Sequence, residues 1–308
     1  MTRIRFVATL LLTLSLACSG DGPPPTKHAL VIGVDGVRVD ALREASTPNI
    51  DALSAEGAVS YDAFAGGELG TSNEQVTFSG PGWSSILAGV WIDKHGVAGN
   101  TSSAFDDSRF DEYPHFFRRI REQMPDAYLS SFVTWGPINE HIVAPGDADE
   151  EFSPEANDSF EGDAMVTDAV VDHLSAQTPD VVFIHLDNPD FQGHLHGFSP
   201  MVPEYVQAVE TVDAQIGQVL DAVRARPTYA REDWLVVVTT DHGGIEQMHG
   251  GQSAEERTIP FIVSGGATQR GATISPGPGH TAVPPTVLRH LGIAINASWG
   301  WESEPFGF

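Results

Sequence analysis

Cysteine and lysine are nearly absent from this 308-residue chain, which has one Cys (Cys18) and two Lys (Lys27 and Lys94). A single cysteine excludes an internal disulfide, and Cys18 falls in an N-terminal signal, so no thiol is left for catalysis. Basic residues are also few, because 16 Lys and Arg stand against 42 Asp and Glu and the formal net charge is −26. A surface this acidic repels other polyanions, which argues against a nucleic-acid polymer as a partner.

Long apolar runs are also lacking, apart from Phe6–Leu16 near the start of the chain. This run follows two arginines and is too short to span a bilayer, so residues 1–18 are predicted to be an export signal. The run ends at Ala17-Cys18, which resembles a bacterial lipoprotein cleavage site and predicts a lipid anchor on Cys18. An ordinary signal peptide cut nearby is the alternative. We therefore expect an exported protein that is periplasmic, secreted or anchored to the outer membrane, with no other membrane contact.

The rest of the chain is typical of one α/β domain. Residues 19–27 (SGDGPPPTK) predict a short, extended, Pro-rich tether, and no second linker or repeat interrupts residues 28–308. Strands are expected at 29–34, 127–133, 180–186, 234–240 and 259–264, and helices at 47–56, 203–223 and 281–291. Because strand-length apolar runs alternate with helical segments, we expect a three-layer αβα sandwich around a mostly parallel central sheet.

Acidic and histidine residues follow several of these expected strands. Asp35 ends the first strand, Asp190 comes shortly after the third, and Asp241-His242 ends the fourth. Ligands of open α/β sheets bind outside the carboxyl ends of the strands, so these side chains are expected at one edge. Carboxylates and imidazoles both suit zinc. The sequence therefore predicts a metal site assembled from strand ends.

Two further histidines are candidates for the same metal site. His194 follows Asp190 by four residues, so both side chains can reach one ion from a helical turn or a tight loop. His249 comes seven residues after His242, and neighbouring glycines allow it to return to the same cleft. His280 is the alternative to His249 as the remaining histidine ligand.

The nucleophile is expected to be a hydroxyl group. Ser79 opens the segment SGPGWSS, a Gly/Pro turn that leads into a short helix. A serine at a helix N-terminus faces the positive end of the helix dipole, and beside zinc its alkoxide becomes accessible near neutral pH. A simple helix cap is the alternative role for Ser79, and Thr77 is the rival nucleophile.

The order of these motifs resembles that of the alkaline phosphatase superfamily. The motifs occur along the chain as Asp35-Gly, Ser79-x-Pro, Pro189-Asp190-x-x-Gly-His194, Thr240-Asp241-His242-Gly and His249-Gly. The type I phosphodiesterase/nucleotide pyrophosphatase branch is the most similar, over residues 28–291. The resemblance implies two zinc ions, with manganese or iron as alternatives. Its ligand sets would be Asp190, His194 and His249 for the first ion, and Asp35, Asp241 and His242 for the second.

The resemblance also implies a hydrolase that cleaves the phosphate esters of small molecules. Ser79 would attack phosphorus and form a covalent phosphoseryl intermediate. The segment where monoesterases of the superfamily carry cations reads FVTWGP (residues 132–137), with no cation. Asn100, shortly after His95-Gly-Val, matches an amide with which the diesterases contact phosphate. A neutral donor suits a singly charged diester, so phosphodiesters are favoured, although Gly80 stands where the diesterases have a Phe that helps form a base slot.

Three alternatives stay open at this point. A phosphomonoesterase would need a cation from elsewhere in the chain, such as Arg38 or Lys94. A sulfatase would share the scaffold, but Trp83 stands where sulfatases carry an arginine. A degenerate lipoprotein that binds metal without turnover would have lost a ligand, whereas candidates for all six ligands and the nucleophile are present.

Overall fold

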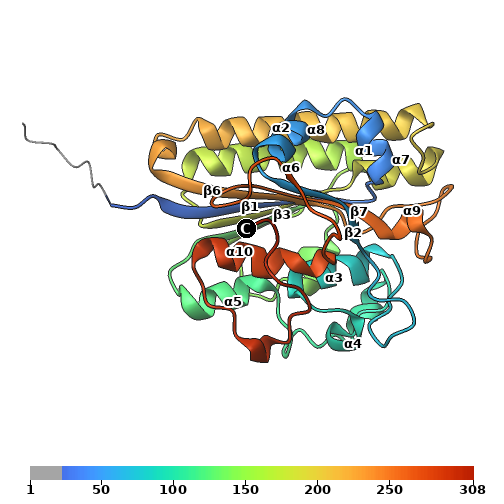
Figure 1. Cartoon of the computed structure of the whole chain (residues 1–308), viewed down its shortest axis with the longest axis horizontal. Coiled ribbons are helices and arrows are strands. Elements are labelled where there is room, and N and C mark those ends of the chain that lie inside the picture. Colours follow the sequence, from blue (N-terminus) through green and yellow to red (C-terminus); the bar gives the residue numbers. More distant parts are fainter. Residues whose placement is uncertain (1–22) are drawn as a thin grey trace, which may run out of the picture.

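The computed structural model describes residues 23–308, so the predicted export signal and Cys18 lie outside the described residues. The described strands form one sheet in the order β4-β3-β5-β1-β6-β7-β2-β8 (Figure 1). Their bounds are β1 (Thr26–Val34), β2 (Ala58–Phe64), β3 (Leu129–Val133), β4 (Glu150–Phe152), β5 (Val181–Leu186), β6 (Glu232–Thr239), β7 (Thr258–Gly265) and β8 (Ala272–Thr273).

Helices cover both faces of this sheet, which confirms the predicted αβα sandwich (Figure 1). One layer contains α1 (Val39–Glu44), α2 (Pro48–Glu56), α6 (Ser159–Ala176), α7 (Asn188–His196) and α8 (Pro203–Arg224). The other layer contains α3 (Ser79–Ala88), α4 (Ile92–His95), α5 (Phe116–Gln123) and α10 (Val283–Leu291). The short helix α9 (Ala254–Arg257) precedes β7. No helix within residues 23–308 is both long and apolar enough to cross a membrane.

The sheet is mostly parallel, as the sequence predicts, and each of the five expected strands is present. The strands from β4 to β6 run parallel, whereas β7 runs antiparallel to both of its neighbours, β6 and β2. An apolar run does not encode its own direction, so this reversal was not predicted. Strand β2 was also missed, because Ser60 and Asp62 interrupt its apolar pattern.

Burial of both faces explains why the central strands are continuous apolar runs. Along β1, Ala29 and Val31 pack into one apolar cluster, while Leu30 and Ile32 pack into the cluster on the opposite face. The strand begins earlier than expected, because Thr26 and Lys27, predicted to be tether, pair with Glu232 and Asp233 of β6. The last predicted helix begins later, at Val283, after a short 3₁₀ turn.

The strand order also sets the position of the site. Strands β5, β1 and β6 are neighbours and run parallel, so their carboxyl ends lie side by side at one edge of the sheet. Asp35 follows β1, helix α7 with Asp190 follows β5, and Asp241 follows β6. The fold therefore brings together three segments that are far apart in the sequence.

A buried arginine, Arg226, links the C-terminal ends of α6 and α8 to the start of β6. The Arg226 guanidinium pairs with Glu232, with Nε 3.0 Å from Oε2, and donates to the carbonyl oxygens of Leu174 (2.6 Å) and Gln177 (2.8 Å). We expect Arg226→Ala to lower the free energy of unfolding by roughly 3 kcal/mol, because the charge of Glu232 loses its ion-pair partner and keeps only the hydrogen bonds from Thr228 and Trp234.

Arg224→Ala is the matched control, since Arg224 is exposed and its ion-pair partner among the described residues is the exposed Asp221. Its free energy of unfolding should stay within about 0.5 kcal/mol of the parent protein. Denaturant unfolding followed by circular dichroism measures both variants, and equal losses in the two would contradict the structural role of Arg226.

Candidate metal centre

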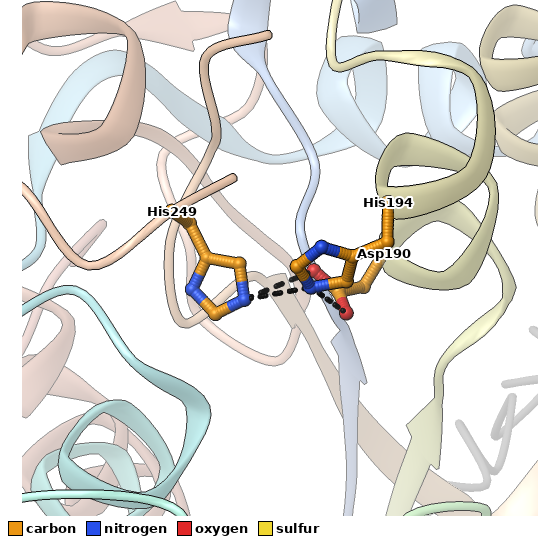
Figure 2. A group of neighbouring side chains, drawn as sticks. All are labelled: Asp190, His194 and His249. Carbon is orange, nitrogen blue, oxygen red and sulfur yellow. Dashed lines mark hydrogen bonds and ion pairs between the residues drawn. The ribbon is translucent and has the colours of Figure 1, made fainter. Parts of the chain in front are cut away.

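One histidine and aspartate cluster is formed by helix α7 and the loop after β6. Asp190 and His194 lie one turn apart on α7, and both point toward His249 (Figure 2). The Nε2 atom of His194 is 3.3 Å from Asp190 Oδ2 and 3.0 Å from His249 Nε2. His249 Nε2 is 3.6 Å from Asp190 Oδ1. The structure thus brings together the three residues predicted for the first ion.

A second cluster lies beside the first and contains the other three predicted ligands. His242 Nε2 is 3.4 Å from Asp35 Oδ1 and 3.2 Å from Asp241 Oδ2. Ser79 Oγ is also 3.4 Å from His242 Nε2, so the predicted nucleophile faces the same point. The rings of His242 and His249 stack with their centroids 3.8 Å apart, which places the two clusters in contact.

The three histidines are all oriented by backbone carbonyl groups. Nδ1 of His194 lies 2.9 Å from the oxygen of Gln247, and Nδ1 of His249 lies 2.8 Å from that of Thr77. Nδ1 of His242 lies 2.8 Å from the oxygen of Gly243. Because a carbonyl only accepts, each Nδ1 carries a hydrogen, which leaves Nε2 as the ring nitrogen that faces the other cluster residues. Metal-binding histidines in proteins are oriented in this way.

The carboxylates of the two clusters lack hydrogen-bond donors on the side that faces the histidines. Within residues 23–308, Asp35 Oδ1, Asp190 Oδ1 and Asp241 Oδ2 are buried atoms that accept no hydrogen bond. Burying an oxygen of a carboxylate without a partner is costly. Three such oxygens in one place therefore indicate a site where a bound cation would supply the missing partner.

The pKa values of the carboxyl groups reflect their burial and their electrostatic repulsion of one another. Burial raises the pKa of Asp190 to about 7, and the negative charge of Asp35 adds to this. The same two influences raise the pKa of Asp241 well above its usual range. Asp35 differs: burial alone would raise its pKa, but the hydrogen bond from His185 and the neighbouring His242 outweigh burial and lower it. The three carboxylates cannot all be charged without nearby positive charge.

Divalent metal ions fit both clusters. Tetrahedral zinc with bonds of about 2.0–2.2 Å to nitrogen and oxygen keeps neighbouring ligand atoms roughly 3.3 Å apart. The separations of 3.0–3.6 Å around His249 Nε2 and of 3.2–3.4 Å around His242 Nε2 match this value. The donor sets, Asp-His-His and Asp-Asp-His, are also ones that zinc accepts. The residues present therefore suit two ions of this kind.

Ser79 and Asn100 lie together at the N-terminus of α3. Ser79 is the first residue of that helix, and its side chain is nearly buried. The N–H of Gly80 donates to Asn100 Oδ1 at 2.7 Å, which leaves the Nδ2 group of Asn100 as the free donor. Asn100 itself is exposed. The structure thus places a neutral hydrogen-bond donor beside the predicted nucleophile.

The two alternative site residues have other contacts. The hydroxyl of Thr77 donates to the carbonyl of Gly251 at 2.9 Å and accepts from the N–H of Gly250 at 3.0 Å. Thr77 therefore fixes the loop that carries His249. His280 is fully buried and stacks on Trp91 with ring centroids 4.8 Å apart, and it belongs to neither of the two clusters.

The two alternative cations are also engaged elsewhere. The guanidinium of Arg38 pairs with Asp40 and donates to the carbonyls of Phe198 (2.8 Å) and Gly244 (3.1 Å). Lys94 pairs with Glu302 and donates to the carbonyl of Gly300 at 2.7 Å. Within residues 23–308, the ion-pair partners of the cluster carboxylates are all histidines.

Three residues that support the clusters were missed in the sequence. His185 lies inside the apolar run of β5, and Trp83 on α3 reads as an ordinary core residue, yet both donate to Asp35 Oδ2. Asp163 of α6 accepts from the N–H groups of Asp187 and Asn188 at 2.7 and 2.8 Å, which fixes the start of α7. In the sequence, the only signal for these three supporting roles was a polar or aromatic residue within a largely apolar segment.

The mostly parallel sheet and the Asp/His clusters at its carboxyl edge fit a metal-dependent phosphoesterase- or sulfatase-type hydrolase of the alkaline phosphatase superfamily. Residues 29–253 match the model of the family "Type I phosphodiesterase / nucleotide pyrophosphatase". The chain belongs to this family, as its motifs predict.

Two solved structures of low sequence identity share the fold of this chain. A putative sulfatase from Bacteroides thetaiotaomicron superposes with a TM-score of 0.70 at 15% identity, over 89% of this chain and 72% of that one. Murine ectonucleotide pyrophosphatase/phosphodiesterase 5, in complex with AMP, superposes with a TM-score of 0.66 at 14% identity, over 87% of this chain and 96% of that one. These likenesses show the fold.

Sequence similarity also extends to 2,3-bisphosphoglycerate-independent phosphoglycerate mutases. The enzyme of Natronomonas pharaonis is 29% identical over 195 residues, which is 60% of this chain and 36% of the relative. The chain thus spans about a third of the length of that curated relative.

We predict that the protein loaded with Zn²⁺ and then desalted holds about two zinc ions per chain. His249→Ala should lower this to about one, because it removes a ligand of one cluster only. His196→Ala, an exposed residue of the same helix as His194, should leave two. Elemental analysis by mass spectrometry measures the content, and two tightly held ions in His249→Ala would contradict the ligand assignment.

Proposed function

We propose that the protein hydrolyses small-molecule phosphate esters, phosphodiesters in preference, with Ser79 as the nucleophile. The observation that carries the proposal is the position of Ser79 Oγ, 3.4 Å from His242 Nε2 in a cluster with Asp35 and Asp241. Membership of the family supports the reaction class. The buried oxygens that face this point support a cation beside the hydroxyl.

The two clusters would hold the metal ions of the reaction. Asp190, His194 and His249 form one binding set, and Asp35, Asp241 and His242 form the other. Two zinc ions supply Lewis acidity, which lowers the pKa of a neighbouring hydroxyl group and offsets the negative charge of a phosphate ester. The chain contributes the orientation of the ligands, since three backbone carbonyls fix the histidine rings.

Ser79 carries the covalent step in this proposal. Its Oγ forms a bond to phosphorus while the bond from phosphorus to the leaving oxygen breaks, and the proton given up by Ser79 is taken up, through solvent, by the leaving alkoxide, which departs as the alcohol. Water then cleaves the phosphoseryl ester, which releases the second product and returns a proton to Ser79. The N-terminus of α3 supports the first step, because the positive end of the helix dipole favours a negative charge there.

The charge of the site favours a diester over a monoester. Asp35, Asp190 and Asp241 already place several buried negative charges at one point. The free donor at the nucleophile is the neutral amide of Asn100, and the side chains of Arg38 and Lys94 are engaged elsewhere. A dianionic monoester gains more from a cationic contact than a singly charged diester does, so the diester fits this site better.

The residue after the proposed nucleophile, Gly80, supports a substrate whose binding does not use an aromatic side chain at this position. A Cβ atom at Gly80 would lie 2.1 Å from the carbonyl oxygen of Gly99, which is far inside van der Waals contact. Position 80 therefore admits no side chain while the Gly99 loop keeps its place. The phenylalanine that would help hold a nucleotide base has no room here.

The zinc-loaded protein should prefer an aryl phosphodiester over the matching aryl monoester by at least about tenfold in kcat/KM, the ratio that 1.4 kcal/mol provides. Asn100→Ala should lower kcat/KM for the diester by roughly 10²-fold, because it removes a donor to the reacting phosphate. Steady-state kinetics on both substrates measure these ratios.

Ser103→Ala is a suitable control for Asn100→Ala, since Ser103 lies in the same loop region and, within residues 23–308, its hydroxyl bonds to the side chain of Thr101 alone. Its kinetics should match those of the parent protein. A preference for the monoester, or an unchanged rate in Asn100→Ala, would count against the diester proposal.

Ser79→Ala should lower kcat by roughly 10³-fold or more without loss of bound zinc, because the covalent step has lost its nucleophile. Rapid acid quenching followed by peptide mass spectrometry should detect phosphate on Ser79 in the parent protein only.

Ser84→Ala is the control for this change, since Ser84 lies on the same helix and its hydroxyl donates to the carbonyl of Gly80 at 2.6 Å. It should keep most of the rate. Phosphate found on Thr77 instead would transfer the role of nucleophile to that residue.

A further inference from the structure

The two oxygens of the Asp35 carboxylate have different surroundings. Oδ2 accepts two hydrogen bonds, from Trp83 Nε1 at 2.9 Å and from His185 Nε2 at 3.1 Å. Oδ1 accepts none and lies 3.4 Å from His242 Nε2 in the second cluster. All the side chains involved are buried to within a few per cent. One oxygen is thus saturated by donors, and the other faces the cluster.

The protonation of His185 is fixed by its neighbours. Nδ1 of His185 accepts from the N–H of Trp135 at 3.4 Å, so the ring hydrogen lies on Nε2, where it is donated to Asp35. His185 lies on β5 directly beside Gly33 of β1. Its position is therefore set by the ladder of hydrogen bonds between two central strands.

Trp83 reaches Asp35 because β1 carries a glycine where the indole passes. A Cβ atom at Gly33 would lie 2.3 Å from the Trp83 ring. The indole packs edge-on against His185, with ring centroids 4.7 Å apart and an interplanar angle of 79°. Gly33, Trp83 and His185 thus form one close-packed unit around the carboxylate.

We propose that His185 and Trp83 are positioning residues that make Asp35 a ligand through one oxygen only. By holding Oδ2 with two donors, they present Oδ1 alone to the point shared by Asp241, His242 and Ser79. The inference rests on the two-metal centre of the proposed function. It adds two residues that never touch the substrate and assigns them control of one metal site.

The neighbouring carboxylates lack comparable support. Asp241 Oδ1 has only long contacts of 3.4 Å, from the N–H of Gly36 and the hydroxyl of Thr240. Asp190 faces His194 and His249 alone among its ion-pair partners. Asp35 is thus the carboxylate whose orientation is built into the core. Loss of such outer contacts typically weakens metal binding about 10–100-fold.

A rival role for His185 is that of a ligand. Asp35, His185 and Asp187 also bring ligand atoms within 4.8 Å of one another and would form a third cation site. However, Nε2 of His185 donates to Asp35, and the carboxylate of Asp187 accepts from the hydroxyl of Ser159. The two roles predict different numbers of bound ions.

Zinc titration of the metal-free protein against a chromophoric chelator tests the proposal. The parent protein should bind about two ions. In His185→Leu, one of the two affinities should fall about 10–100-fold while the other changes little. Trp83→Phe should weaken the same ion by a smaller factor, because one donor remains. His185→Gln returns an N–H near the position of Nε2 and should restore much of the affinity.

Trp91→Phe is the matched control, because Trp91 is a buried tryptophan that stacks on Phe64 and His280, away from Asp35. Both of its zinc affinities should equal those of the parent protein. Circular dichroism and thermal melting of the metal-free variants establish that each one folds. Should His185→Leu fail to fold, Trp83→Phe and His185→Gln carry the test.

The possible results separate the two roles of His185. Unchanged affinities in both Trp83→Phe and His185→Leu would overturn the proposal. A parent protein that binds three ions, with one lost in His185→Leu, would make His185 a ligand instead. A parent protein that binds no zinc would refute the metal centre itself, and with it the proposed function. Weakened binding of one ion with unaltered capacity is the expected result.

Discussion

Electrostatic repulsion among buried carboxylates is the constraint on which the rest of this structure depends. Asp35, Asp190 and Asp241 meet at the carboxyl edge of the sheet, where burial and the negative charge of Asp35 raise the pKa values of Asp190 and Asp241. Histidine rings cancel this charge only in part, because the hydrogen bond with Asp190 raises the pKa of His194 to about 9 whereas burial lowers the pKa of His242 to about 3. A fold that keeps such a group of buried carboxylates must gain its stability from other interactions. Here the two apolar faces of the sheet provide that stability.

The scaffold holds these charges through short-range geometry. Neighbouring parallel strands supply two of the carboxylates directly, and a helix that begins straight after a third strand supplies another. Backbone carbonyls then fix the histidine rings, and the hydroxyl of Thr77 fixes the loop that carries His249. Main-chain atoms therefore fix the histidine rings, while side chains such as Thr77, Trp83 and His185 hold the loop of His249 and the carboxylate of Asp35.

The sequence predicts the sandwich and brings forward all six residues of the two clusters, because apolar runs and ordered motifs are local features. It does not predict the direction of β7 or the presence of β2, because pairing between strands is not local. The roles of His185 and Trp83 were also out of reach. Inside an apolar segment, a histidine or tryptophan that donates to a distant carboxylate looks the same as one that only fills the core.

The carbonyl of Gly99 lies so close to the backbone of Gly80 that it limits which mutations the site can accept. The loop that blocks a side chain at position 80 is the one that leads to Asn100, whose amide is held by the Gly80 N–H. Any rearrangement that opened room for a larger residue beside the nucleophile would also displace that amide. The space beside Ser79 and the placement of the Asn100 amide are therefore coupled through a single turn, so a larger residue at position 80 would change both at once.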